Sequence, residues 1–597
     1  MTGVQTCALP ISGLAPGVAA PAAAAPSDGA AGERVLRYAF RVAETGFDPT
    51  QINDIYSRTV TAHLFEALYA YDHLARPALI RPLVADGLPE HSDDFRTWTV
   101  RVQRGIRFAD DPAFGGRVRE LVAEDFVYAI KRYADPRLKS PNWSYVDSFG
   151  LLGLAEARRR ALAGQPFDHD HPLPGLRSLD RHTLQFRLAE PRPRFIEFLA
   201  ASDLFGAVAR EVVEHYGDQI AAHPVGTGPF VLGRWRRGSL IELVRNPHYR
   251  ERHYDAQPAP DDLEGQALLA RLRGRRLPMV DRVEVSIVEE SQPRWLAFLN
   301  GQHDFIEQVP PDFVDQALPG GQLAPYLAKQ GVQAWRDLRA DQSMTIFNMD
   351  DPVVGGYTPP QVALRRAIGL GLDVAREIQV VQRGQARPAN APISPHTAAY
   401  DPAVRTEMGV HDAARAQALL DLHGWLDRDG DGWRERPDGQ PFTLTWRIED
   451  NQRGRQLAEL WQRDLQALGL RVRFSPGKWP ELLKAARAGH FQLWHVGNLS
   501  ASPDSQGALQ RYDGLQVGGQ NMARFRRPEF DRVYQRLSAL PDGPERLAAF
   551  REAVRLAVVW MPYKVRFHSL ITDLAHAGVI GYRRPLFWQD WWHCVDL

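Results

Sequence analysis

An acidic loop is the part of the sequence whose spacing comes nearest to a metal site. Asp427, Asp429, Asp431, Gly432 and Asp438 occupy positions one, three, five, six and twelve of a calcium-binding EF-hand loop. The last of them is Asp where a longer Glu normally binds with both oxygens, and a Trp-Arg-Glu segment follows where the loop should continue. Asp and Gly also form ordinary turns. Calcium is one alternative, but the sequence favours a plain turn, so we expect no metal site and no cofactor.

The usual motifs of enzyme catalysis are absent from this sequence. There is no GxSxG, no HExxH, no GxxxxGK(S/T) and no CxxC. The 19 histidines are scattered, and no nucleophile and base are clustered in the sequence. We therefore expect no catalytic residues and predict that the protein is not an enzyme. An exported hydrolase remains the less favoured alternative.

The composition is that of an ordinary globular protein. Lys plus Arg and Asp plus Glu both number 72, which gives no electrostatic case for a nucleic-acid or membrane-surface partner. A hydrophobic content of 44% and a charged content of 24% are typical of soluble proteins. The length of 597 residues exceeds what one hydrophobic core usually supports, so two to four lobes are expected.

The first 32 residues are rich in Ala, Pro and Gly, and we interpret residues 1–32 as the remnant of an export leader or a disordered lead. Cys7 and Cys594 are the two cysteines, and one of them would be lost with a leader. The fold must then rest on packing rather than on an intrachain disulfide. Cys7 lacks the lead-in of a lipoprotein cysteine. These features predict an exported, soluble protein that is free in the periplasm.

The stretch from residue 223 to 249 predicts a β-hairpin. A Pro-Val-Gly-Thr-Gly-Pro turn leads into an alternating strand that contains Phe230 and Trp235. A second alternating strand contains Ile241 and Leu243 and ends in Arg-Asn-Pro-x-Tyr. This hairpin resembles the signature of the extracellular solute-binding proteins of family 5, the oligopeptide and dipeptide type.

Two further segments resemble the same family in the expected order. Residues 98–132 contain an alternating strand, an Arg-x-Gly-x-x-Phe turn and Ala-Glu-Asp-Phe at the start of a helix. Glu124 and Asp125 would lie in the first helical turn, where carboxylates favour the positive end of the helix dipole. Residues 345–373 are similar to the family's Phe-Asn strand and its helix with Arg-x-Ala-Ile. The resemblance covers most of the chain from about residue 33 onward.

The resemblance implies an α/β fold, a two-lobe periplasmic binding protein that is class II-like and of the large type with an extra subdomain. A hinge would join the lobes through crossings near Val288 and Leu570. The helical pattern of residues 454–469 stands in a β-α-β alternation, from which we predict a largely parallel sheet in lobe two. The expected boundaries are 33–288 for lobe one with a subdomain at about 76–190, 289–568 for lobe two, and 569–597 for a return to lobe one.

The family's function is implied in the same way. Members capture a peptide or peptide-like ligand between two lobes and deliver it to an inner-membrane ABC permease and its ATPase. We expect this role, for a monomer with no nucleic-acid partner. The alternative is the same role for a non-peptide solute such as a nickel chelate, haem or an oligosaccharide.

The resemblance also indicates candidate ligand contacts. Peptide receptors of the family often place an Asp in the loop after the strand that contains Trp494, where it pairs with the ligand's α-ammonium. Ala501 stands at that position here, so we expect a free α-ammonium not to be the main recognition element. The candidate contacts are Tyr56 and Phe65 in lobe one, Trp143 and Tyr145 in the subdomain, and Phe347, Asn348, Trp494, Asn498 and Asp504 in lobe two.

Overall fold

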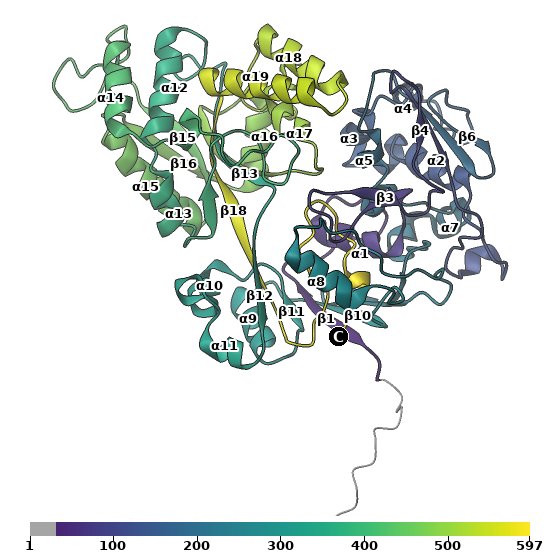
Figure 1. Cartoon of the computed structure of the whole chain (residues 1–597). Coiled ribbons are helices and arrows are strands. Elements are labelled where there is room, and N and C mark those ends of the chain that lie inside the picture. The colour runs from purple at the N-terminus through teal and green to yellow at the C-terminus, as the bar shows by residue number, and fades with distance from the viewer. Residues whose placement is uncertain (1–31) are drawn as a thin grey trace, which may run out of the picture.

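The computed structural model describes residues 32–597, and it contains two α/β lobes (Figure 1). Cys7 and the rest of the predicted leader, up to residue 31, lie outside the described residues. Within the described part of the chain, no helix is long and apolar enough to cross a membrane. Separate hydrophobic clusters fill lobe one, its subdomain and lobe two, as expected for a chain of this length.

Lobe one is built on a four-stranded sheet in the order β1-β10-β9-β8. The predicted hairpin is confirmed as β8 and β9, and Ile241 and Leu243 of β9 are fully buried. β1 pairs with β10 in parallel, whereas the other pairs are antiparallel. The elements are β1 (Val35–Phe40), β8 (Phe230–Arg236), β9 (Leu240–Arg245), β10 (Arg282–Ile287), α1 (Ile55–Leu64) and α8 (Leu263–Leu272).

The turn before β8 requires glycine because it lies against the end of α1. A Cβ atom on Gly226 would stand 2.0 Å from the carbonyl oxygen of Leu64, and one on Gly228 would stand 2.6 Å from that of His63. Backbone can approach backbone this closely only where no side chain intervenes. The turn therefore fixes α1 against the sheet, and the end of α1 borders the cavities described below.

The subdomain of lobe one has its own sheet, in the order β4-β5-β7-β6. Its helix α2 begins as predicted, because Asp125 accepts a hydrogen bond from the backbone N–H of Val122 at 2.8 Å. The elements of the subdomain and of the segments on either side of it are β2 (Tyr69–Tyr71), β3 (Ile80–Pro82), β4 (Glu90–His91), β5 (Thr97–Arg101), β6 (Leu176–Asp180), β7 (Thr183–Arg187), α2 (Ala123–Arg132), α3 (Trp143–Asp147), α4 (Leu154–Leu162), α5 (Phe195–Phe198), α6 (Ser202–Phe205) and α7 (Arg210–Tyr216).

Lobe two contains an eight-stranded sheet whose main path is β11-β18-β13-β17-β15-β16. The prediction of a largely parallel sheet was wrong, because β15 pairs in parallel with β16 and β17 but all other pairs are antiparallel. The long strand β18 forms antiparallel pairs with β11, β12, β13 and β14, and β13 also pairs antiparallel with β17. The strands are β11 (Phe305–Ile306), β12 (Gln333–Leu338), β13 (Asp341–Phe347), β14 (Ala386–Pro388), β15 (Leu444–Glu449), β16 (Val472–Gly477), β17 (Leu493–Leu499) and β18 (Tyr563–Ala575).

Helices cover this sheet and extend toward lobe one. Trp461 of α15 stacks on Trp446 of β15 at 4.4 Å between ring centroids, which joins helix to sheet in the core. The helices are α9 (Ser291–Leu299), α10 (Pro311–Ala317), α11 (Pro325–Lys329), α12 (Pro359–Gly371), α13 (Val374–Val380), α14 (Ala413–Leu422), α15 (Gln452–Gln466), α16 (Trp479–Ala488), α17 (Gln506–Leu509), α18 (Pro528–Ala539) and α19 (Pro544–Trp560).

The chain crosses between the lobes at one end of the molecule, where β18 meets β11 and β12. Phe305 of β11 stacks on Tyr38 of β1 with ring centroids 5.8 Å apart, and after β18 the chain continues into the core of lobe one, where Trp592 stacks on His63 at 4.3 Å. At the opposite end, α18 and α19 lie beside α3 and α5 (Figure 1). The lobes are thus joined covalently at one end and meet by contact at the other.

Candidate functional site

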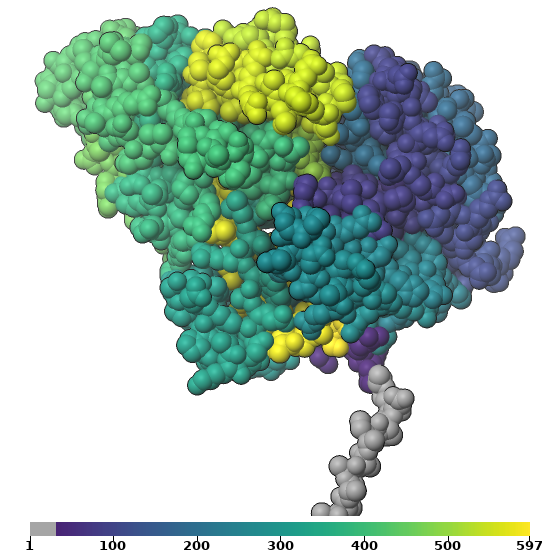
Figure 2. All heavy atoms as spheres, in the orientation of Figure 1, coloured from purple at the N-terminus to yellow at the C-terminus, as the bar shows by residue number. Residues whose placement is uncertain are grey.

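A cavity of about 580 Å³ lies between the lobes, and we call it the interlobe cavity. Lobe one contributes the segment 76–80 together with Arg194 and Glu197. Lobe two contributes the segment 395–398 and the pair Pro503 and Asp504. Pockets of this size at a boundary between domains are typical of small-ligand sites. In Figure 2 the yellow surface of α18 and α19 touches the blue subdomain at the top, and a small opening is visible below.

A second cavity, of about 190 Å³, adjoins the first and is called the inner cavity. Glu197 lines both cavities, so it stands at the wall between them. Ala501 and Ser502 are the contribution of lobe two to the inner cavity, and lobe one supplies the rest of the lining. The charged and aromatic residues that lobe one contributes include Arg58, Tyr71, Tyr145, Asp203, Trp588 and Asp590.

A third cavity of about 360 Å³ lies within lobe one and is called the lobe-one recess. It shares Ala62, Tyr71, Ser202, Trp588 and Asp590 with the inner cavity. The three cavities therefore lie next to one another, from the boundary between the lobes into lobe one.

The loop of lobe two that faces these cavities follows the carboxyl end of β17. β17 runs parallel to β15 and antiparallel to β13. The backbone N–H of Ser500 donates to the carbonyl of Ala340 at 2.8 Å, which holds the start of the loop on β13's side of the sheet. The following residues, Ala501 to Asp504, then reach the boundary between the lobes.

Asp504 lies in an ion-pair network that crosses this boundary. Arg194 of lobe one donates from Nε to Asp504 Oδ2 at 2.7 Å, and Arg546 of α19 donates to both carboxylate oxygens at 2.7 and 2.9 Å. The side chains of Asp504 and Arg546 are 9% and 2% exposed. Since two guanidinium groups already satisfy it, Asp504 serves first as a contact between the lobes.

A second buried network lies at the end where the chain crosses between the lobes. Asp573 of β18 accepts from Arg584 at 2.7 and 2.6 Å, from the Tyr582 hydroxyl at 2.7 Å and from the backbone N–H of Gln308 at 2.8 Å. Arg584 also donates to Glu307 at 3.2 Å. Desolvation, the largest single effect, raises the pKa of the Glu307 carboxyl, but the charge of Arg584 and the hydrogen bond from Tyr38 together with more distant arginines make the net shift downward. This network fixes the geometry of the crossing.

The predicted contacts of lobe one fall in different surroundings. Tyr145 of α3 lines the inner cavity, and Phe65 lines the lobe-one recess. Tyr56 of α1 accepts from Arg41 Nε at 3.2 Å and its ring lies 4.9 Å from that of Phe40. Trp143 lies under the guanidinium of Arg158 at 4.9 Å. Tyr145 and Phe65 thus border the candidate site.

The predicted contacts of lobe two, apart from Asp504, lie away from the cavities just described. Phe347 is fully buried in the core of the lobe. The Asn348 side-chain amide donates to the carbonyls of Gly489 and Phe491 at 2.9 and 2.7 Å. Trp494 is fully buried against Trp479, whereas Asn498 is half-buried near the end of β17. Their roles as ligand contacts stay predictions.

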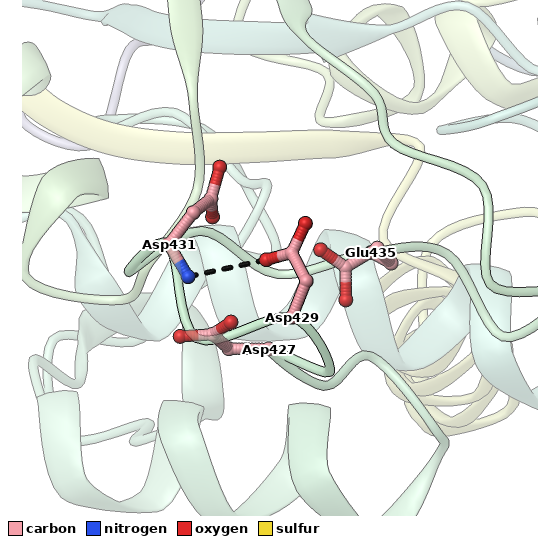
Figure 3. A group of neighbouring side chains, drawn as sticks. All are labelled: Asp427, Asp429, Asp431 and Glu435. Carbon is pink, nitrogen blue, oxygen red and sulfur yellow. Dashed lines mark hydrogen bonds between the residues drawn. The ribbon is translucent and has the colours of Figure 1, made fainter.

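The acidic loop that resembles an EF-hand lies between α14 and β15, and it is held by backbone hydrogen bonds. Asp427 accepts from the N–H groups of Gly430 and Gly432 at 2.7 and 3.0 Å, as in an Asp/Gly turn. The fourth carboxylate that faces the group is Glu435 rather than Asp438 (Figure 3). Glu435, at position nine of the loop, therefore takes the place that the sequence pattern gave to Asp438 at position twelve. The preference for a plain turn over a calcium site stays a prediction.

Two lining residues were not anticipated from the sequence. Glu197 follows the Pro-rich joint of residues 191–195, and Asp590 lies in the aromatic segment Phe-Trp-Gln-Asp-Trp-Trp near the C-terminus. A carboxylate within an aromatic run was a usable signal for Asp590. No local pattern marks Glu197, because folding alone brings it beside the loop of lobe two.

Comparison with known proteins agrees with this architecture. The model of the bacterial extracellular solute-binding proteins, family 5 Middle, matches residues 80–520. The chain belongs to this family. Within family 5, the chain is 26% identical over 567 residues to Di/tripeptide-binding protein 2 of Pseudomonas aeruginosa strain UCBPP-PA14, with 92% of each chain covered.

Two solved structures of peptide-binding proteins share the family 5 fold with this chain. The unliganded open form of the murein tripeptide-binding protein MppA has a TM-score of 0.70 at 19% identity, and the match covers 95% of this chain and 98% of the other. DppA from Helicobacter pylori in complex with the peptide STSA has a TM-score of 0.68 at 19% identity, with the same coverage. The two-lobe α/β fold predicted from the sequence is confirmed.

Proposed function

We propose that the protein is a periplasmic solute receptor that captures a peptide or peptide-like ligand between its two lobes. It would deliver this ligand to an inner-membrane ABC permease and its ATPase. The observation that carries the proposal is the pair of adjacent cavities at the boundary between the lobes, each lined from both sides. The peptide-binding names of the relatives support the ligand class.

The architecture supports capture by closure of the lobes. Covalent crossings lie at one end of the boundary, and the Arg194–Asp504 contact lies at the other. A receptor of this kind binds by shifting between open and closed arrangements around a hinge. We propose the boundaries 33–288, 289–568 and 569–597 for lobe one, lobe two and the return segment, with the subdomain at about 76–190.

The ligand would contact both lobes at once. Tyr145 and Phe65 from lobe one and Asp504 at the boundary are the predicted contacts that border the cavities. Backbone groups of Ala501 and Ser502, at the inner cavity, would hydrogen-bond a peptide main chain, a mode that tolerates varied side chains. We propose that the protein acts as a monomer and as a binding protein, without catalysis of its own.

Calorimetric titration tests this function. The full chain is unfolded, freed of bound ligand, refolded, and titrated with peptides of two to six residues. Haem, a nickel chelate and an oligosaccharide form the comparison set. Binding of peptides in preference to the other solutes is expected. Binding of one of the other solutes while all peptides give no heat would overturn the proposal.

A further inference from the structure

The inner cavity contains more negative than positive side chains. Glu197, Asp203 and Asp590 line it together with one guanidinium, that of Arg58. Arg58 donates from Nε to Asp203 Oδ2 at 2.5 Å, so these two charges compensate each other. Glu197 and Asp590 are left as the carboxyl groups that face the cavity.

The cations nearest to Glu197 are engaged elsewhere. Arg194 and Arg546 both direct their N–H groups to Asp504, and Arg194 also donates to the carbonyls of Ser538 and Leu540 at 3.0 Å. Desolvation, followed by the negative charge of Asp504, raises the pKa of the Glu197 carboxyl to about 8. Desolvation, together with the negative charges of Asp203 and Glu66, raises the pKa of the Asp590 carboxyl to about 7, although the nearby charge of Arg252 acts in the opposite direction. A cationic group in the cavity would lower both pKa values by supplying the missing positive charge.

Aromatic rings complete the wall around these carboxyl groups. Tyr71, Tyr145, Phe587 and Trp588 all line the inner cavity. Tyr71 and Trp588 are stacked with ring centroids 5.2 Å apart and an interplanar angle of 14°. Rings of this kind attract an ammonium group that lies over their faces, and the attraction grows when water is excluded. The carboxylates and the aromatic rings therefore both favour a cationic group, such as an ammonium, in this cavity.

We propose that the inner cavity binds the ammonium group of the ligand, held by the carboxylates of Glu197 and Asp590 in lobe one. This inference rests on the proposed function and adds the recognised group to it. It reverses the expectation from the sequence that a free ammonium is not the main recognition element. That expectation considered lobe two alone, whereas the structure brings Glu197 next to Ala501 and Ser502.

Binding of an ammonium group would release protons, because the carboxyl groups must ionise to pair with it. The other groups that face Glu197 are Asp504, Arg194, Arg546 and the Ser502 hydroxyl, and Tyr71 and Tyr145 lie within its electrostatic reach. Tyr71 and Tyr145 stay neutral because burial raises their pKa values. Glu197 and Asp590 are thus the groups expected to release protons near pH 7.

The first test compares Ala-Ala-Ala with N-acetyl-Ala-Ala-Ala by calorimetry on the refolded full chain. A charge-assisted hydrogen bond corresponds to about a 10- to 150-fold change in affinity, so acetylation should weaken binding by that factor. N-acetyl-Ala-Lys-Ala distinguishes the source of the ammonium. If N-acetyl-Ala-Lys-Ala binds as tightly as Ala-Ala-Ala, and Glu197→Gln weakens its binding, the group recognised is a side-chain amine rather than the N-terminus.

The second test uses Glu197→Gln and Asp590→Asn, with Glu190→Gln as a matched control because the Glu190 side chain is 72% exposed. Glu197→Gln should weaken Ala-Ala-Ala by about 10- to 150-fold and leave the acetylated peptide nearly unchanged. Calorimetric titrations in two buffers of different ionisation enthalpy measure the protons released on binding. At pH 7, Glu197→Gln should release up to about one proton fewer than the wild type when Ala-Ala-Ala binds. The control should behave like the wild type.

Two results overturn the inference in different ways. If both peptides bind equally, and Glu197→Gln and Asp590→Asn change neither affinity nor proton release, the ammonium site is wrong while the peptide receptor stands. If no peptide binds, the proposed function fails and the inference fails with it. Should a variant not fold, the comparison of the two peptides on the wild-type chain decides alone.

Discussion

Arg194 and Asp504 form an ion pair across the boundary between the lobes, with Arg194 Nε 2.7 Å from Asp504 Oδ2. The same guanidinium donates to the carbonyls of Ser538 and Leu540 at the carboxyl end of α18. Carbonyl groups at a helix C-terminus have no partner within the helix and attract cations. Arg194 thus fastens lobe one to the end of a lobe-two helix, at the opposite end from the chain crossings.

Arg194→Met should favour separation of the lobes and weaken ligand binding. A charge-assisted contact contributes roughly 1.5–3 kcal/mol, so we expect the dissociation constant to rise by about 10- to 150-fold. Small-angle scattering at saturating ligand should show a larger radius of gyration than for the wild type. Arg187→Met, at an exposed position on β7, is the control. Equal radii and affinities for Arg194→Met and the wild type would contradict a closing role.

Arg584→Met should destabilise the crossing between the lobes. It leaves Asp573, which is fully buried, without its bidentate partner. Removing one member of a buried pair costs about 3–5 kcal/mol because the remaining charge is not solvated. Urea denaturation should therefore show an earlier transition. Arg101→Met is the control, since its partner Glu90 is exposed, and a midpoint for Arg584→Met as high as the control's would refute this account.

Gly226→Ala should disturb lobe one, because the new Cβ atom would meet the Leu64 carbonyl oxygen at 2.0 Å. Overpacking against rigid backbone costs roughly 1–3 kcal/mol or more. A thermal melt should show a clear loss of stability. Gly507→Ala is the matched control, since nothing lies within 4 Å of its added Cβ atom. Equal melting temperatures for the two variants would show that the turn can move away from α1.

The raised pKa of Glu197 gives the ligand-free protein a pH dependence with a definite sign. Its pKa of about 8 in the folded state lies above the ordinary value of 4.5, so the folded chain holds a proton that the unfolded chain releases. The resulting stabilisation is full below about pH 4.5 and is lost as the pH rises toward 8. As the pH rises from about 4.5 to 8, the melting temperature of the wild type should fall relative to that of Glu197→Gln. A difference that stays constant from pH 5 to 8.5 would refute the shift.

Local patterns predicted much of the fold. The hairpin of β8 and β9 was predictable because alternation and turn residues lie next to each other in the sequence. Helix α15 ends at Gln466, close to Gly469, whose φ of +70° makes it suited to the stop that was expected there. The direction of strands in lobe two was not predictable in this way. β18 takes its partners from segments that are distant in the sequence, and alternation within a strand does not specify the partner.

The site was less predictable than the fold for the same reason. Trp494 and Phe347 were expected at the ligand from their place in a family motif. Both side chains are fully buried in lobe two, and their contact with a ligand stays a prediction. Glu197 and Asp590 come from distant parts of the chain and meet at one cavity. Glu197 and Asp590 are candidate site residues because they are buried and because the arginines near Glu197 pair with Asp504 instead. Burial and pairing arise only when the chain folds, so the sequence did not show them.

Native mass spectrometry tests the central claim most directly. The full chain is purified without unfolding, and any ligand that leaves with the protein is released and fragmented. The account predicts a peptide with at least one free amino group. A haem, a nickel chelate or an oligosaccharide in place of a peptide would contradict it, as would a ligand-free spectrum that stays unchanged when peptides are added.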